Sequence, residues 1–256
     1  MSNSRIHESA IVSSRAELGA GVTVGPYAVV EDDVVIGDGS SVGSHALIAA
    51  GARIGKEVHI HHGAVVGTVP QDLKFGGEKT LLVIGDHTVI REYATLNRGT
   101  LHRGQTTVGA HCLLMAYSHV AHDCILGDHV IMSNSVNLAG HVEIEEWAII
   151  GGMVPVHQFV RIGRHAMVGG GFRVPQDICP YSLYGGKVIG VNHVGLKRRE
   201  FSAEAIAALE HAFRILFRSK LNTTQAVERV RAEVELTAEV QHVLDFIASS
   251  ERGICK

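Results

Sequence analysis

Aliphatic residues recur at every sixth position along most of the chain. From Ile6 to Val174 this register holds Ile, Leu, Val or Met, and the exceptions are Asp72, Glu78 and His102. An α-helix would require a period near 3.6 residues and a flat strand a period of about 2. A period of six instead indicates a short strand followed by a tight turn, and three such units make a triangular coil of about 18 residues.

Glycine often follows the in-phase aliphatic residue, where the backbone turns or approaches a neighbouring coil closely. Stacked coils would form parallel strands roughly 4.8 Å apart around one continuous aliphatic core. The pattern therefore predicts a mainly β protein, a left-handed parallel β-helix of hexapeptide repeats over residues 1–196. Two polar segments, at about 67–83 and 97–107, interrupt the hexads while keeping their phase, and we expect them to loop out of the prism.

The register ends at Val174, and the sequence changes character beyond it. Residues 175–195 contain two prolines and show no regular period. Residues 197–256 change to helical spacing and predict a small α-helical domain. Three amphipathic helices are expected there, within 202–220, 222–235 and 237–252, with Ser202 as the N-cap of the first. Such a domain would also cap the end of the stack, which otherwise exposes strand edges.

The composition argues against some classes of function but does not identify the function. The net charge is −3 and the isoelectric point is near 6.6, which argues against a nucleic-acid partner. The N-terminal stretch lacks an apolar segment typical of a signal peptide, and no apolar run approaches the ~20 residues of a membrane span. The four cysteines show no CxxC spacing, so we expect reduced thiols in a cytoplasmic protein.

Residues that are 18 apart should stack, and this rule selects one histidine from "SHVAHDCILGDHV". His122 would lie next to Gly140, which lies next to Gln158, while Asp123 would lie next to His141. A histidine beside a carboxylate can act as a general base, and a bare glycine can offer its N–H to an oxyanion. The alternative is a surface histidine on a turn, which is the expected position of His129.

Metal binding is a second interpretation of the histidines. His59, His61, His62, His119 and His122 have the right chemistry for zinc, and γ-class carbonic anhydrases bind zinc on a β-helix of this kind. The paired-histidine spacing of that class is missing around His122, so we expect no metal ion. Lys74 and the basic run Lys197–Arg199 are either solvated or phosphate contacts.

The motifs "PQDLKFGGE", "AHDC", "LAGHV", "GGMVPVHQF" and "GLKRR" occur together, and the whole chain resembles the UDP-N-acetylglucosamine O-acyltransferase family of lipid A biosynthesis. The resemblance implies a homotrimer with active sites between neighbouring prisms. It also implies transfer of a 3-hydroxyacyl group from acyl carrier protein to the glucosamine 3-hydroxyl of UDP-N-acetylglucosamine, without a cofactor. This is the first step of lipid A biosynthesis.

Residue roles follow from the motif match. The resemblance implies that His122 is the general base, that Asp123 supports it, and that the N–H of Gly140 lines the oxyanion hole. The implied substrate-binding residues are Asp72, Lys74, His119, His141, Gln158, Asn192, Arg198 and Arg199. The implied acyl-chain groove contains Gly152, His157 and Gly170, and the implied carrier-protein docking residues are Arg214 and Arg218.

The sequence departs from the family at several points. The segment between Tyr181 and Asn192 is short, Val194 stands where the family often has Glu, and Glu200 stands where it usually has Gly. Three alternative functions remain. They are acylation of a 3-amino sugar to give an amide, a zinc enzyme of the carbonic-anhydrase kind, and a β-helix scaffold without catalysis.

Overall fold

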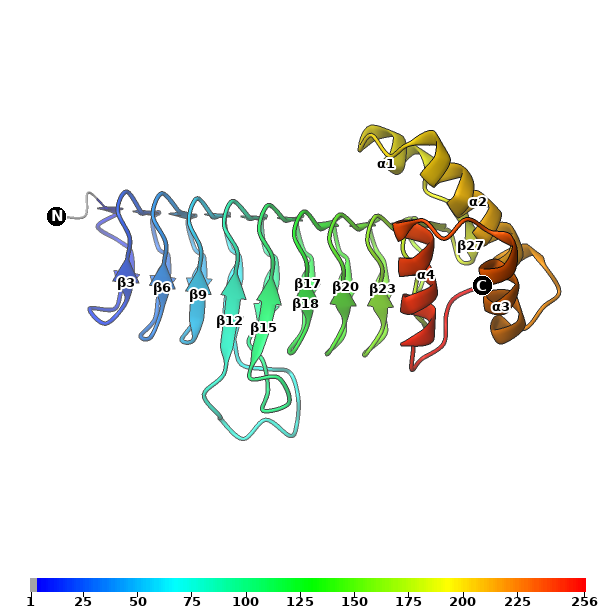
Figure 1. Cartoon of the computed structure of the whole chain (residues 1–256). Helices are drawn as coiled ribbons and strands as arrows, with labels where there is room; N and C mark the ends of the chain where they lie inside the picture. Colours follow the sequence, from blue (N-terminus) through cyan, green and yellow to red (C-terminus); the bar gives the residue numbers. More distant parts are fainter. Residues whose placement is uncertain (1–3) are drawn as a thin grey trace.

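The computed structural model describes residues 4–256 as a triangular prism of stacked coils with helices at one end (Figure 1). Most strands span two residues, and each coil contributes one strand to each of three sheets, which we call sheets A, B and C. The coil is left-handed, as the hexads predicted. We name the turns by the sheets that they join: corner A–B, corner B–C and corner C–A.

The strands are short because each ends where the chain turns a corner. Sheet A contains β1 (Arg5–Ile6), β4 (Thr23–Val24), β7 (Ser41–Val42), β10 (His59–Ile60), β13 (Val89–Ile90), β16 (Leu113–Leu114), β19 (Ile131–Met132), β22 (Ile149–Ile150), β25 (Met167–Val168), β26 (Ser182–Tyr184) and β27 (Val188–Val191). Sheet B contains β2 (Ile11–Val12), β5 (Val29–Val30), β8 (Leu47–Ile48), β11 (Val65–Thr68), β14 (Thr95–Asn97), β17 (His119–Val120), β20 (Asn137–Leu138) and β23 (Pro155–Val156). Sheet C contains β3 (Glu17–Leu18), β6 (Val35–Ile36), β9 (Ala52–Ile54), β12 (Leu81–Ile84), β15 (Gln105–Val108), β18 (Ile125–Leu126), β21 (Glu143–Ile144) and β24 (Arg161–Ile162).

The in-phase residue of each strand points into the prism. Leu126 is 1% exposed, whereas its neighbour Ile125 is 39% exposed on the outer face of sheet C. Burying a leucine side chain contributes about 1.5–3 kcal/mol, and the stack repeats this contribution coil after coil. The in-phase positions of the hexad are therefore the side chains that fill the core.

Close approach between coils and the left-handed backbone conformation fall at different positions of the turn. A Cβ at Gly85 would lie 2.6 Å from the backbone nitrogen of Ala110, so this glycine is required for close approach between coils. The positive φ angle falls two residues further along the turn, where some turns have glycine, such as Gly39 (φ 70°), and many have another residue, such as His87 (φ 58°). The sequence interpretation, which gave both tasks to glycine, missed this division.

Both inserted segments leave the prism at corner B–C. Thirty residues separate Val65 from its partner Thr95, and twenty-four separate Thr95 from His119, where an uninterrupted coil would need eighteen. Each insertion is thus a multiple of six, which explains why the register survives. The loops run over 69–80 and 98–104, and Figure 1 shows them side by side below the stack.

The C-terminal part is more regular than its sequence indicated. β26 and β27 form an antiparallel hairpin that extends sheet A, where the sequence predicted irregular structure. α1 (His193–Arg198) was not predicted, whereas α2 (Ala203–Arg218), α3 (Thr223–Glu233) and α4 (Ala238–Ala248) match the three expected helices. Ser202 is the N-cap of α2, because its side chain accepts a hydrogen bond from the N–H of Ala205.

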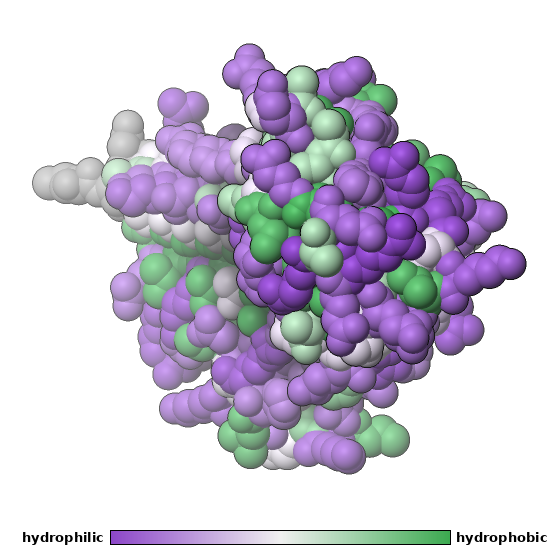
Figure 2. All heavy atoms as spheres, turned by 45° about the vertical axis from the view of Figure 1, so that its right-hand side comes forward, coloured by the Kyte–Doolittle hydropathy of each residue, from purple (hydrophilic) through white to green (hydrophobic). Residues whose placement is uncertain are grey.

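The end of the chain closes the stack at sheet C. The Arg161 guanidinium lies 4.3 Å from the ring centroid of Phe246 in α4, and Asp177 pairs with Ile254 in a parallel bridge. Figure 2 shows this end with a largely hydrophilic surface and scattered apolar residues. Within residues 4–256, no helix combines the length and apolar character needed to cross a membrane.

Leu126 and Ile125 provide a matched test of the core. Leu126→Ala should lower the free energy of unfolding by about 2–5 kcal/mol, because it leaves a cavity inside the prism. Ile125→Ala should change it by less than about 1 kcal/mol, because that side chain already contacts water. Urea denaturation followed by circular dichroism measures both values, and equal losses would contradict the assignment of the two faces.

Candidate active site

His122 and Asp123 follow β17 at corner B–C. The carboxylate Oδ2 of Asp123 accepts a hydrogen bond from Nδ1 of His122 at 2.9 Å. Because an ionised carboxylate only accepts, Nδ1 carries the proton and Nε2 is left with its lone pair. The side chain of His122 is 14% exposed and that of Asp123 is 0% exposed, so the pair joins a reachable base to a buried carboxylate.

Asp123 is saturated with hydrogen bonds. Its Oδ1 accepts from the backbone N–H of Thr100 (3.0 Å) and of Arg103 (3.3 Å), and its Oδ2 also accepts from the Thr100 hydroxyl (2.6 Å). Burial by itself would raise the pKa of Asp123, but the hydrogen bonds from Thr100 and His122 outweigh it and hold that pKa below its usual range. The carboxylate is therefore ionised and can accept the hydrogen bond from the His122 imidazole.

Gly140 lies against the ring of His122 in the next coil, as the stacking rule predicted. A Cβ at this position would lie 2.6 Å from Cε1 of His122, so only glycine leaves room for the imidazole. No acceptor among residues 4–256 takes the N–H of Gly140. The N–H is thus available to a bound oxygen.

His141 completes the cluster. Its ring stacks on Phe159 at 4.4 Å between centroids and meets His122 edge-on at 5.0 Å. Its Nδ1 is buried without a hydrogen-bond partner and lies 3.8 Å from Oδ2 of Asp123. Burial lowers the pKa of His141, so the ring is neutral at physiological pH.

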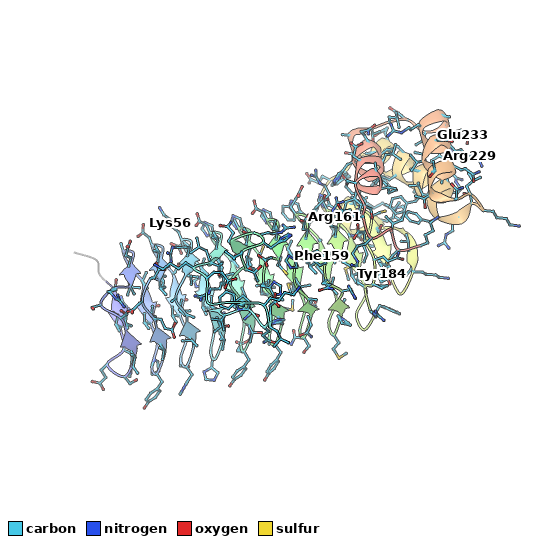
Figure 3. All side chains as sticks on the ribbon, turned by 90° about the horizontal axis from the view of Figure 1, so that it is seen from below. Lys56, Phe159, Arg161, Tyr184, Arg229 and Glu233 are labelled. Atoms are coloured by element: carbon cyan, nitrogen blue, oxygen red, sulfur yellow. The ribbon has the colours of Figure 1, made fainter. Side chains whose placement is uncertain are left out.

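The inserted loops bring further predicted residues to the same place. A cavity of about 370 Å³ opens beside His141, and Asp72 and Lys74 of the first loop line it. An adjoining cavity of about 480 Å³ shares His102, His141 and Phe159 with the first and extends to Arg161. Phe159 and Arg161 lie side by side near the helical end of the stack (Figure 3). His119 lies nearby on sheet B, where its Nδ1 hydrogen-bonds with the hydroxyl of Thr95 at 2.7 Å.

His157 and Gln158 stand at the same corner, one coil beyond Gly140, and Nδ1 of His157 lies 3.1 Å from the carbonyl oxygen of Gln158. Gly152 and Gly170 instead follow sheet A at corner A–B. A Cβ on Gly170 would lie 3.1 Å from the carbonyl oxygen of Gly152, so the two glycines stack directly. The structure therefore places the predicted groove residues at two different corners.

The remaining predicted residues lie at corner C–A or beyond it. Arg198 and Arg199 line a cavity of about 400 Å³ with Trp147 and His165, and Arg199 lies 3.8 Å from the Trp147 ring centroid. Asn192 already uses its amide, which donates to the carbonyl oxygen of His165 and accepts from the N–H of Gly195. One chain does not bring these residues to His122.

Arg214 and Arg218 of α2 face β27 across a pocket of about 190 Å³, and Arg218 donates to the carbonyl oxygen of Ile189 at 2.6 Å. His129 lies on the turn after β18, as predicted, but it is not fully exposed. Its ring is half-buried and stacks on Trp147 at 3.7 Å, inside an aromatic column at corner C–A.

Within residues 4–256, one group of three side chains has a spacing that could hold a metal ion. His122, Asp123 and His141 offer ligand atoms within 4.8 Å of one another. However, the hydrogen bonds from Thr100, Arg103 and His122 already occupy the Asp123 carboxylate, which makes it an orienting group rather than a ligand. His59, His61 and His62 lie elsewhere, along a groove of about 870 Å³ on sheet A.

The fold and the His–Asp pair define a transferase built from hexapeptide repeats, and the family model "Bacterial transferase hexapeptide (six repeats)" matches residues 15–50 and 105–140. A second model, "Udp N-acetylglucosamine O-acyltransferase; Domain 2", matches residues 177–255. The chain is 46% identical to the acyl-carrier-protein–UDP-N-acetylglucosamine O-acyltransferase of Thiobacillus denitrificans and 44% identical to that of Aliarcobacter butzleri. These alignments cover 98% and 97% of this chain and 99% and 97% of the relatives.

The solved structure of the UDP-N-acetylglucosamine acyltransferase from Bacteroides fragilis superposes with a TM-score of 0.96. It is 43% identical, and the match covers 98% of this chain and 99% of that one. The chain belongs to the UDP-N-acetylglucosamine O-acyltransferase family, and the resemblance expected from its motifs is confirmed.

His165 makes the stability of corner C–A depend on pH. Burial, together with the nearby charges of Arg199 and Arg164, lowers its pKa from 6.5 to about 4. Between pH 6.5 and 4, His165 is therefore protonated in the unfolded chain but not in the folded protein. Stability is lost as pH falls through this range. His165→Phe should keep the stack and remove this loss. The melting temperature of the variant should gain on that of the wild type as pH falls through this window, and a constant difference would contradict the assignment.

Proposed function

We propose that this protein transfers a 3-hydroxyacyl group from acyl carrier protein to the glucosamine 3-hydroxyl of UDP-N-acetylglucosamine, the first step of lipid A biosynthesis. The observation that carries the proposal is the buried Asp123 carboxylate holding Nδ1 of His122, which leaves Nε2 free beside Gly140. The relatives that bear this name match the chain over nearly its full length. The four cysteines are unpaired and buried, and we place the reaction in the cytoplasm.

The chemistry follows from the hydrogen bond that leaves Nε2 of His122 facing the substrate. Nε2 removes the proton of the sugar 3-hydroxyl, and the resulting alkoxide attacks the thioester carbonyl. The N–H of Gly140 donates to the oxyanion of the tetrahedral intermediate, while Asp123 stabilises the imidazolium. Collapse of the intermediate breaks the carbon–sulfur bond, and the leaving thiolate takes the proton back from His122. No cofactor takes part.

Asp72, Lys74, His141 and Gln158 bind the sugar in this proposal. The supporting observation is that residues of the first loop and of three coils converge on one corner. Lys74 supplies a positive charge and Asp72 an acceptor for sugar hydroxyls. His119 lines the same cleft from sheet B.

The distribution of exposed side chains supports a homotrimer. The outward positions of sheet A are apolar over Leu113, Ile131, Ile149 and Met167, whereas the outer face of sheet C carries charged residues such as Glu143 and Arg161. Corner A–B also exposes large side chains, with Tyr27 61%, Tyr117 60% and Met153 71% exposed. Apolar surface of this kind is covered when copies associate. We therefore propose that corner A–B lies at a threefold axis.

This arrangement completes the active site. With corner A–B at the axis, sheet A of one protomer faces sheet B of the next, so corner C–A of one lies beside corner B–C of the other. Arg198, Arg199 and Asn192 then reach the sugar nucleotide held at His122 of the neighbouring copy. The apolar face of sheet A, with Gly152, Gly170 and the neighbour's His157, forms the acyl-chain groove. Arg214 and Arg218 at the helical end bind the acidic carrier protein.

Replacing the base tests the mechanism. His122→Ala should lower kcat by about 10²–10⁴-fold with an unchanged circular dichroism spectrum, because the general base is removed. His87→Ala, at corner C–A, is the matched control and should keep wild-type turnover. Turnover is measured by mass spectrometry of the acylated sugar nucleotide. Near-normal activity of His122→Ala would exclude the proposed base.

Subunit complementation tests the shared site. His122→Ala and Arg198→Ala proteins should each be nearly inactive. Trimers refolded from an equal mixture should recover activity, because each mixed trimer has one site that pairs an intact His122 with an intact Arg198 from the next copy, which makes about one site in four overall. Failure to recover activity in mixed trimers, verified by native mass spectrometry, would show that both residues act within one chain.

A further inference from the structure

The burial of Asp123 does not come from the coil that carries it. Asp33 occupies the same corner B–C with nearly the same left-handed backbone, φ 52° against 59°. The side chain of Asp33 is 64% exposed, whereas that of Asp123 is 0% exposed. The difference is the loop over 98–104, which projects from this corner and supplies donors to Asp123.

Thr100 is the residue of this loop that reaches both carboxylate oxygens. Its backbone N–H donates to Oδ1 at 3.0 Å, and its hydroxyl donates to Oδ2 at 2.6 Å. Oδ2 is also the oxygen that accepts from Nδ1 of His122 at 2.9 Å. The two donors share one oxygen, so the hydroxyl of Thr100 controls where the remaining lone pair of Oδ2 points.

The loop itself is fixed in place. The N–H of Gly99 donates to the carbonyl oxygen of Leu81, and the N–H of Gly104 donates to that of Thr100. Arg103, just before β15, forms an ion pair with Glu143 of β21, two strands further along sheet C. Thr100 is only 9% exposed, so its hydroxyl has little access to water. The contacts of the loop set the position of this hydroxyl.

We propose that Thr100 is a positioning residue for the general base, and that its hydroxyl holds the Asp123 carboxylate in the rotation that aims Nε2 of His122 at the sugar hydroxyl. The inference rests on the proposed function of His122. A charge-assisted hydrogen bond to a fully buried carboxylate is stronger than a neutral one, so its loss lets the carboxylate rotate. The six-residue insertion thus converts an exposed corner aspartate into part of the reaction machinery.

A purely structural role would look like that of Thr88. Thr88 is 0% exposed, and its hydroxyl also links coils, since it donates to the carbonyl oxygen of Gly109 and accepts from the N–H of Cys112. It lies at corner C–A and touches no ionised group through these bonds. Thr88→Val is therefore the matched control for losing a buried threonine hydroxyl.

The test compares Thr100→Val, Thr100→Ser and Thr88→Val. Thr100→Val should lower kcat by about 10- to 100-fold, the cost of a misaimed catalytic group, with KM for the sugar nucleotide changed by less than about threefold. Thr100→Ser keeps the hydroxyl and should restore most of kcat. Thr88→Val should lower the melting temperature and leave kcat unchanged.

The outcomes also distinguish this inference from the proposed function. If His122→Ala is inactive but Thr100→Val keeps wild-type kcat, the inference is overturned and the base stands. Equal impairment of Thr100→Val and Thr100→Ser would likewise show that the hydroxyl is not the group that matters. If His122→Ala keeps full activity, the proposed function itself fails. Nitrogen-15 NMR of the His122 ring gives a readout without turnover, because the Nδ1–H tautomer should lose population in Thr100→Val only.

Discussion

The vertical stacking of residues 18 apart is the constraint on which the rest of this structure depends. It forces one aliphatic side chain per strand into the prism and requires glycine at turns where a Cβ would meet the backbone of the next coil, as at Gly85. The same stacking brings His122, Gly140 and His141 together from adjacent coils. The active site is thus built by the repetition that builds the core, and the geometry of the site is as rigid as the stack.

The insertions show how a repeat protein gains chemistry without losing its register. Both loops leave corner B–C, and their lengths preserve the hexad phase. The first brings Asp72 and Lys74 to the cavity beside His141, and the second covers Asp123. Saturation by hydrogen-bond donors keeps that carboxylate ionised despite its burial, and its hydrogen bond fixes the tautomer of His122. An uninterrupted corner leaves the equivalent Asp33 in water.

The three corners divide the work. Corner B–C carries the His122–Asp123 pair, corner C–A carries Arg198 and Arg199 beside Trp147, and corner A–B presents exposed aromatic side chains and the stacked pair Gly152 and Gly170. A triangular prism cannot bring two of its own corners together. The proposed site uses residues from two corners and therefore requires another copy, and this requirement is a physical reason for the proposed trimer that is independent of the area buried.

The sequence by itself determined the prism, its core and the identity of the His–Asp pair, because a period of six repeats without interruption in phase and residues 18 apart must stack. It also located Ser202 as a helix cap, since capping is a local interaction. The sequence did not predict the hairpin β26–β27, the helix α1 or the stacking that half-buries His129. Packing across coils decides these three features. The sequence also did not predict the contact between Thr100 and Asp123, for a different reason. A looped-out residue has no place in the register, so only the tertiary structure, which folds the loop back over corner B–C, could decide that its hydroxyl meets Asp123.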